Sequence, residues 1–178
     1  MKPLTLWGMW SSTGRFTLAK KDGFDIEWEG EDVLLDLLDD ERLMRIALEE
    51  YTKLGLLAEE GMKALVHHDE GDLEDSISFD PAIRQGDHII VEGGSNSPYA
   101  WKRHEEPYRM GTYTKYDNGS KYPRYYLNGR GRRTLTKPSW RGIRPGRKYA
   151  QNAINAIQPD YEAINARILE RWMNGEGD

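Results

Sequence analysis

A long stripe of apolar residues at helical spacing constrains the fold of this chain more than any other feature. Between residues 40 and 66 the apolar positions recur every three or four residues, which places them on one face of a helix. They are Leu43, Ala47, Tyr51, Leu54, Ala58, Met62 and Leu65. Asp40 is suited to be the N-cap residue. Gly55 and Gly61 weaken such a helix by roughly 1 kcal/mol each relative to Ala, so packing of the stripe must offset that cost.

The N-terminal part is predicted to hold an arm and a hairpin. Residues 1–14 contain Trp7 and Trp10 in no regular pattern, so we expect a mobile arm whose tryptophans dock on another surface. Alternating apolar residues in 16–28, interrupted by a polar turn that ends in glycine, predict a β-hairpin. The apolar run 33–38 favours a short helix of its own.

Two short strands are predicted after the long helix. Residues 76–79 and 88–91 are the apolar runs, and Pro81 and Gly86 mark the connection between them. The glycine-rich stretch 93–98 is predicted to end the second strand.

The C-terminal part is predicted to be helical. Its apolar residues keep helical phase, and they are Ile154, Ile157, Tyr161, Ile164, Ile168 and Trp172. Pro159 either kinks this helix or begins a second one at its first turn. We therefore expect one domain over residues 15–173 and a disordered tail at 174–178.

The charge of the chain is distributed unevenly. Residues 101–149 carry 14 Lys and Arg against 3 Asp and Glu, a local net charge of +11, whereas the rest of the chain has a net charge of −16. Three interpretations follow: two solvated faces, contact of the basic segment with DNA, or its contact with the acidic body of a neighbouring subunit.

The basic segment is also rich in aromatic residues. Residues 99–146 have no clear period, and we expect an extended segment that orders on assembly, for example as a long hairpin. Tyrosine and arginine are typical of protein interfaces and also of nucleic-acid contacts. The predicted interface residues are Trp7, Trp10, Tyr99, Trp101, Arg103, Tyr108, Arg109, Tyr113, Tyr116, Arg124, Tyr125, Tyr126, Arg130, Arg132, Arg133, Trp140, Arg141 and Arg144.

Composition excludes several other classes. The 178 residues contain no cysteine, which excludes disulfides and thiolate metal sites and fits a reducing compartment. There is no run of 18 apolar residues and no apolar run suited to a signal peptide, so neither a membrane span nor a leader is expected. Apolar residues make up only 38% of the chain, and such a lean core leaves surface for partners.

Three polar groups are candidates for chemistry. Residues 67–70 are His-His-Asp-Glu, but adjacent residues point apart, so we expect a solvated helix end and no metal site. Residues 104–106 are His-Glu-Glu, which could serve a hydrolase only with a partner that the sequence does not specify. The glycines in 128–133 lack the context of a phosphate-binding loop.

The order of four motifs resembles a known family. A helix that ends near Lys63 is followed by a glycine turn and a strand, then by Tyr-Ala-x-x-x-His-Glu, then by Lys-Tyr-x-x-x-Ala. The matching residues are Gly71, Leu73, Ser76 and Ile77, then Tyr99, Ala100, His104 and Glu105, then Lys148, Tyr149 and Ala153. Over residues 24–173 the chain thereby resembles the tail-completion, or head–tail joining, proteins of long-tailed bacteriophages, which are also described as minor capsid or tail components.

The resemblance implies an α+β fold: a long helix and a C-terminal helix packed on a small antiparallel sheet, with a long basic, Tyr-rich loop or hairpin insertion over residues 99–146. It implies a non-enzymatic structural protein without a cofactor, assembled in the host cytoplasm into the virion neck. It also implies a homo-oligomeric ring, a hexamer, with DNA in its lumen. The ring would contact portal, adaptor or stopper proteins on one side and tail terminator or tail tube proteins on the other.

Two rival functions remain. The first is a nucleic-acid-binding protein that uses the basic aromatic segment 99–149, because arginines neutralise phosphates and tyrosines stack on bases. The second is a hydrolase that uses His104 and Glu105.

Overall fold

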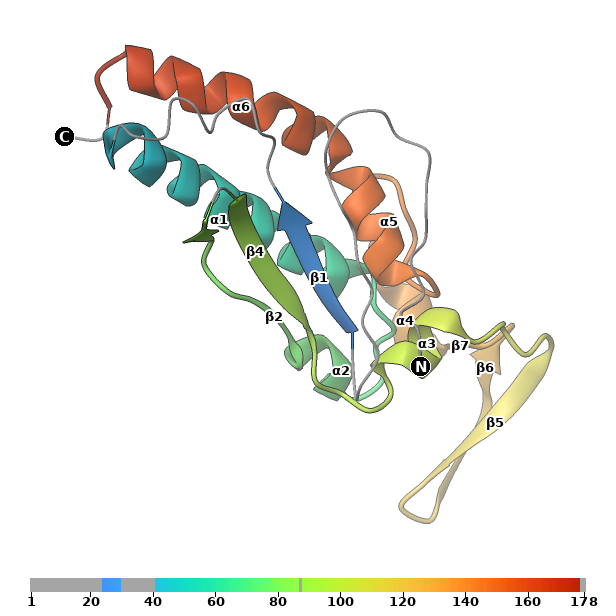
Figure 1. The fold of residues 1–178 in the computed structure, drawn as a ribbon. Helices are drawn as coiled ribbons and strands as arrows, with labels where there is room; N and C mark the ends of the chain where they lie inside the picture. The colour runs from blue at the N-terminus through green and yellow to red at the C-terminus, as the bar shows by residue number, and fades with distance from the viewer. Residues whose placement is uncertain (1–23, 30–40, 87, 177–178) are drawn as a thin grey trace.

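The long helix forms the centre of the core. The computed structural model describes residues 24–29, 41–86 and 88–176 (Figure 1). Helix α1 runs over Glu41–Leu65, as predicted, and all seven residues of its apolar stripe are buried. The expected N-cap Asp40, the tryptophan arm, the first strand of the 16–28 hairpin and the 33–38 helix lie outside the described residues.

A four-stranded antiparallel sheet packs against α1. Its strands are β1 (Phe24–Glu29), β2 (Ile77–Phe79), β3 (Ile83–Gln85) and β4 (His88–Ser95). β4 is central: β1 pairs along one edge, while β2 and β3 follow one another along the other edge. The two strands predicted after the helix are therefore present, and the second strand of the expected N-terminal hairpin is seen paired with β4.

The glycine-rich stretch does not end the second strand as predicted, because β4 continues through Gly93 and Gly94 to Ser95. The reason is close packing. A Cβ atom on Gly93 would lie 2.2 Å from the Phe79 ring, and one on Gly55 of α1 would lie 2.7 Å from Val91. These glycines let the strands and the helix approach one another, a role that composition alone does not distinguish from a break.

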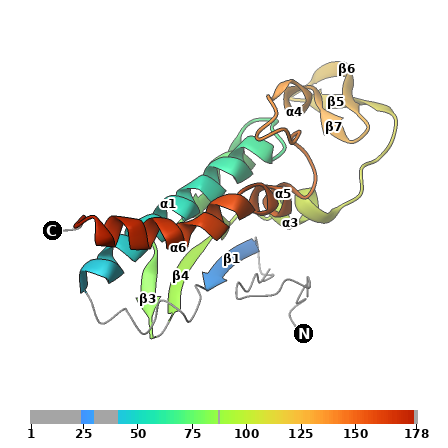
Figure 2. The ribbon, with the colours of Figure 1, turned by 90° about the horizontal axis from the view of Figure 1, so that it is seen from above.

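Two helices complete the core. α5 covers Tyr149–Ala156 and α6 covers Gln158–Met173, with Pro159 in the first turn of α6. Of the two predicted alternatives, the start of a second helix is therefore the one observed. The apolar residues Ile154, Ile157, Ile164 and Ile168 are all buried. α1 contacts both the sheet and this pair of helices, and α6 runs alongside α1 (Figure 2).

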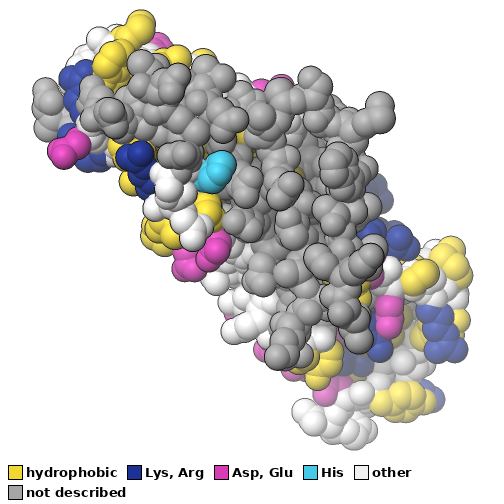
Figure 3. Space-filling model, viewed as in Figure 1, with side chains coloured by type: hydrophobic (Ala, Val, Ile, Leu, Met, Phe, Trp, Pro, Cys, Tyr) yellow, Lys and Arg dark blue, Asp and Glu magenta, His cyan; other side chains and the backbone are white. Residues whose placement is uncertain are grey.

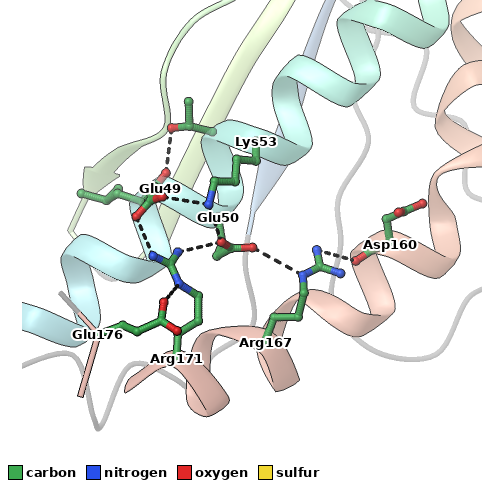
Figure 4. A network of polar contacts seen from close by, with 9 residues as sticks. Glu49, Glu50, Lys53, Asp160, Arg167, Arg171 and Glu176 are labelled. Atoms are coloured by element: carbon green, nitrogen blue, oxygen red, sulfur yellow. Dashed lines mark hydrogen bonds and ion pairs between the residues drawn. The ribbon is translucent and has the colours of Figure 1, made fainter. Parts of the chain in front are cut away.

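A network of charged residues joins α1 to α6 (Figure 4). Glu50 on α1 accepts hydrogen bonds from Arg171 at 2.7 Å and from Arg167 at 3.4 Å, and it pairs with Lys53 at 2.9 Å. Burial alone would raise the pKa of Glu50, but hydrogen bonds from Lys53, Arg171 and Arg167 lower it. Glu176 pairs with Arg171 at 2.8 Å, so residues 174–176 of the expected tail are placed beside α6.

Residues 99–146 form short elements and a long hairpin. They are α3 (Ala100–Glu105), β5 (Thr112–Asp117), β6 (Ser120–Leu127), β7 (Arg130–Gly131) and α4 (Arg132–Thr136). β5, β6 and β7 make a second antiparallel sheet. The α+β fold with a hairpin insertion is thus confirmed.

Candidate interaction surface

The hairpin formed by β5 and β6 projects from the end of the body opposite the C-terminus (Figure 1). Its turn is Asn118-Gly119, and a second Asn-Gly pair, Asn128-Gly129, joins β6 to β7. All four residues have positive φ, as the type I′ turns of tight hairpins require. Both dipeptides are local hairpin signals, and they could have located the strands in a segment that shows no apolar period.

Asp69, just after α1, holds the hairpin to the body. Its carboxylate accepts a hydrogen bond from the Tyr125 hydroxyl and pairs with Lys115 at 2.8 Å, while its carbonyl accepts from Arg133. Burial alone would raise the pKa of Asp69, but hydrogen bonds from Lys115 and Tyr125 lower it. Burial and the hydrogen bond to Asp69 raise the pKa of Tyr125 to about 12. Two positions on the hairpin thus converge on one carboxylate.

Residues near Asp69 are also contacted by side chains of the basic segment. The Thr134 hydroxyl exchanges hydrogen bonds with the backbone N–H and carbonyl of His68, both at 3.0 Å. Lys137 donates to the Lys63 carbonyl at 2.6 Å and pairs with Glu74 at 2.9 Å, which satisfies the C-terminal end of α1. The expectation of a solvated helix end is therefore wrong for residues 67–69, which are partly buried because this corner receives residues from the insertion, whereas Glu70 is exposed.

No metal cluster forms at this corner: within the described ranges, no group of three or more His, Asp or Glu side chains could hold a metal ion. His67 lies instead beside the Tyr108 ring, with ring centroids 5.8 Å apart. Burial, together with the positive charge of Arg103, Arg130 and Lys137, lowers the pKa of His67 to about 4.

Part of the basic segment is neutralised within the chain. Besides Lys115 and Lys137, Arg141 pairs with Asp160 at 2.5 Å on α6 and Lys148 pairs with Glu105. The uneven charge distribution had suggested that these cations contact DNA or a neighbouring subunit, but they pair with carboxylates of the same chain.

The predicted interface residues fall into an internal and an exposed set. Tyr125 is only 7% exposed, and Trp140 packs on Gly61 of the core helix and donates to Glu60 at 3.0 Å. Trp101, Tyr108, Tyr113, Tyr126 and Arg130 are half-buried. Trp7 and Trp10 lie outside the described residues.

The exposed set is concentrated in the insertion. Of the predicted residues, Tyr99 and Tyr116 are 65% and 74% exposed, and Tyr122, which was not among those predicted, is 47% exposed beside them. Arg103, Arg109, Arg124, Arg132 and Arg144 are exposed and, among the residues described, have no carboxylate partner within ion-pair distance. Basic and apolar side chains lie close together on the hairpin in the space-filling view (Figure 3). This exposed set is the candidate interaction surface.

The residues of the last two family motifs meet at the junction of α3 and α5. Glu105 pairs with Lys148, the Lys148 backbone N–H donates to the His104 carbonyl at 3.1 Å, and the Tyr149 hydroxyl donates to the Ala100 carbonyl at 3.3 Å. His104 is only 1% exposed, and burial lowers its pKa although Glu105 acts in the opposite direction. The geometry is that of a packed helix junction, and the His104 ring has little access to solvent.

The first family motif forms a turn in the same way. Gly71 has a φ of 114°, in the left-handed region that favours glycine, and it leads into the short helix α2 (Asp72–Asp75) before β2. The Ser76 hydroxyl lies 2.6 Å from that of Ser95 on β4 and donates to the Leu73 carbonyl, and Ile77 is fully buried. These residues connect α1 to the sheet.

No helix in the part of the chain that the structure describes is long and apolar enough to cross a membrane. Comparison with protein-family models, curated proteins and solved structures finds no match for this chain.

Proposed function

We propose that this protein is a structural subunit of a bacteriophage neck, which forms a ring that joins the head to the tail and lets DNA pass. The observation that carries the proposal is the convergence of the motif residues. Residues 100–105 and 148–149 are far apart in the sequence, yet they meet in one helix junction. The resemblance therefore rests on residues that act together as a packing unit of the fold.

The exposed part of the insertion supports a role in assembly. A hairpin that extends beyond the body and carries Tyr116 and Tyr122 offers contact area that a chain working alone does not need. A projecting element on one side of a subunit suits heterologous contacts, in which unlike surfaces of identical subunits meet and close into a ring. Portal or adaptor proteins and tail proteins would meet the two faces of that ring.

The runner-up is binding of nucleic acid along the hairpin. It is favoured by the exposed arginines that have no carboxylate partner among the described residues, since such groups neutralise phosphates. The internal pairing of Lys115, Lys137 and Arg141 weakens it, because those charges are already used within the chain.

The proposed ring and the runner-up, nucleic-acid binding, predict different particle masses and a different salt dependence of DNA affinity. We expect light scattering of the purified chain, alone or mixed with purified phage tails, to detect assemblies of about six chains. Substitution of both Tyr116 and Tyr122 by Ser should abolish them without unfolding the body. A chain that stays at its monomer mass of 20.6 kDa in both conditions would contradict the proposal. DNA affinity that falls steeply with salt, without assembly, would favour the runner-up.

A further inference from the structure

A pocket lies between α3 and the base of the hairpin. Its volume is about 290 Å³, and α3, the connection to β5, and both strands of the hairpin contribute to its walls. Tyr108 holds this wall in place, because its hydroxyl accepts the Arg147 backbone N–H at 2.5 Å. A Cβ atom on Gly129 would lie 2.7 Å from the Tyr108 ring, so the hairpin base packs tightly against it. The pocket is part of the folded structure of a single chain.

Positive charge dominates the lining. Lys102, Arg103 and Arg109 line the pocket together with Glu106, which is the one carboxylate among the described lining residues. Glu106 lies 3.7 Å from Lys102, and both side chains are about 60% exposed, so this pair is weak. Arg103 and Arg109 have no carboxylate within ion-pair distance in the described ranges. Lys115, Lys137, Arg141 and Lys148, by contrast, are all paired.

A second observation at the same place concerns His67, which lines the pocket. Its Nδ1 atom is buried and has no hydrogen-bond partner among the described residues. A buried polar atom without a partner is rare in folded proteins and calls for an explanation. The pKa of His67 is lowered first by burial and then by Arg103 and Arg130, which is consistent with a positive potential around the ring. An anion bound in the pocket would reduce the positive potential around the His67 ring.

The rest of the lining is aromatic. Tyr108, Tyr113 and Tyr126 contribute ring surface, and the Arg109 guanidinium lies 3.9 Å from the centroid of the Tyr113 ring. Tyrosine rings and stacked guanidinium groups are the surfaces on which nucleobases stack. The pocket volume is at the lower end of the range for small-ligand sites, so it suits one nucleotide unit rather than a duplex.

We propose that this pocket binds a single nucleotide unit, with Arg103 and Arg109 on its phosphate and the tyrosine rings beside its base. The nucleotide is either a free nucleoside monophosphate or one unit of a single strand, since both present the same chemistry. The site does not depend on ring formation, because one chain supplies every wall described above.

Calorimetric titration of the full chain at low salt tests the site. The probes are thymidine monophosphate, thymidine, inorganic phosphate, glutamate and single-stranded oligothymidylate. We expect the monophosphate to bind more tightly than inorganic phosphate or glutamate, and thymidine not to bind. Tighter binding of the strand than of the monophosphate would identify a strand as the source, and equal binding would identify the free nucleotide.

Matched double variants test the residues. Arg103→Gln with Arg109→Gln should weaken monophosphate binding at least tenfold, since hydrogen bonds to charged groups are the strong ones. Arg84→Gln with Lys121→Gln removes the same charge from exposed positions outside the pocket and outside the candidate interaction surface, and it should change binding by less than twofold. Unchanged melting temperatures would show that both variants fold.

Three results would overturn the proposal. The first is that the unmodified chain binds neither the monophosphate nor the strand. The second is that glutamate or inorganic phosphate binds as tightly as the monophosphate. The third is that both double variants lose affinity equally, which would indicate a diffuse electrostatic effect rather than a site.

Discussion

Glu50 on α1 is unusual for a charged residue, because its side chain is buried and only 7% exposed. The neighbouring Glu49 shares its partners Lys53 and Arg171, but its side chain is 48% exposed. The pKa of Glu49 is lowered mainly by hydrogen bonds from Lys53 and Arg171, whereas that of Glu50 is lowered against the cost of burial. The two carboxylates therefore form a natural pair for measuring what burial adds.

We expect Glu50→Gln to lower the free energy of unfolding by about 2 kcal/mol in urea denaturation. This is less than the loss typical of a fully buried pair, because Arg167 and Arg171 are 43% and 22% exposed and water can reach them. Glu49→Gln, the control, should cost less than about 1 kcal/mol. Equal losses in the two variants would show that burial of Glu50 adds nothing.

At the scale of elements, the attachment of the hairpin depends on Asp69. Three groups of the insertion converge on this residue, whereas Glu70 beside it lies 3.8 Å from Lys115 and is 61% exposed. No residue of β5 belongs to the main hydrophobic core. Local opening of the hairpin should therefore need less free energy than global unfolding.

Asp69→Asn should accelerate amide hydrogen exchange in β5 and β6 by about tenfold, because the loss of one charged acceptor costs about 1.4 kcal/mol. Exchange in the centre of α1 should stay unchanged. Glu70→Gln serves as the control and should leave both rates as they are. If α1 accelerated as much as the hairpin in Asp69→Asn, the hairpin would not be a separate unit of stability.

At the scale of the whole molecule, acid should weaken the fold before the carboxylates titrate. The pKa of His67 is lowered to about 4 by burial and nearby cations, and burial also lowers that of His104. Above pH 6.5 both rings are neutral in the folded and unfolded chains, so stability is complete. As the pH falls below 6.5, the unfolded chain binds protons that the folded chain does not bind, and stability is lost.

We therefore expect the free energy of unfolding to fall between pH 6.5 and pH 5 by at most about 1.4 kcal/mol per pH unit for each histidine. Urea midpoints at pH 7, 6 and 5 measure this slope, and His67→Gln should reduce it. His88→Gln is the control, because His88 is exposed at the start of β4. A flat profile between pH 7 and pH 5 would contradict the burial of both rings.

The sequence by itself determined the elements that follow a local period. The α1 stripe, the strands around Pro81 and the helical phase of the C-terminal part follow from backbone geometry, which acts over a few residues, whereas the sequence leaves open whether Pro159 kinks the helix or begins a new one. The positive φ of Gly71 was predictable for the same reason. The two Asn-Gly turns were equally local signals, although the absence of apolar alternation around them hid where the strands of the expected hairpin begin and end.

The tertiary structure alone decided which charges meet. Lys115 and Tyr125 contact Asp69 across 46 and 56 residues, and Lys148 contacts Glu105 across 43. No local pattern encodes such pairs, because a charge interacts with whatever the fold brings within a few ångströms of it. The same reason explains Gly93. In the sequence this glycine indicates the end of a strand, but in the fold its missing side chain leaves room for the Phe79 ring once β2 and β4 are paired.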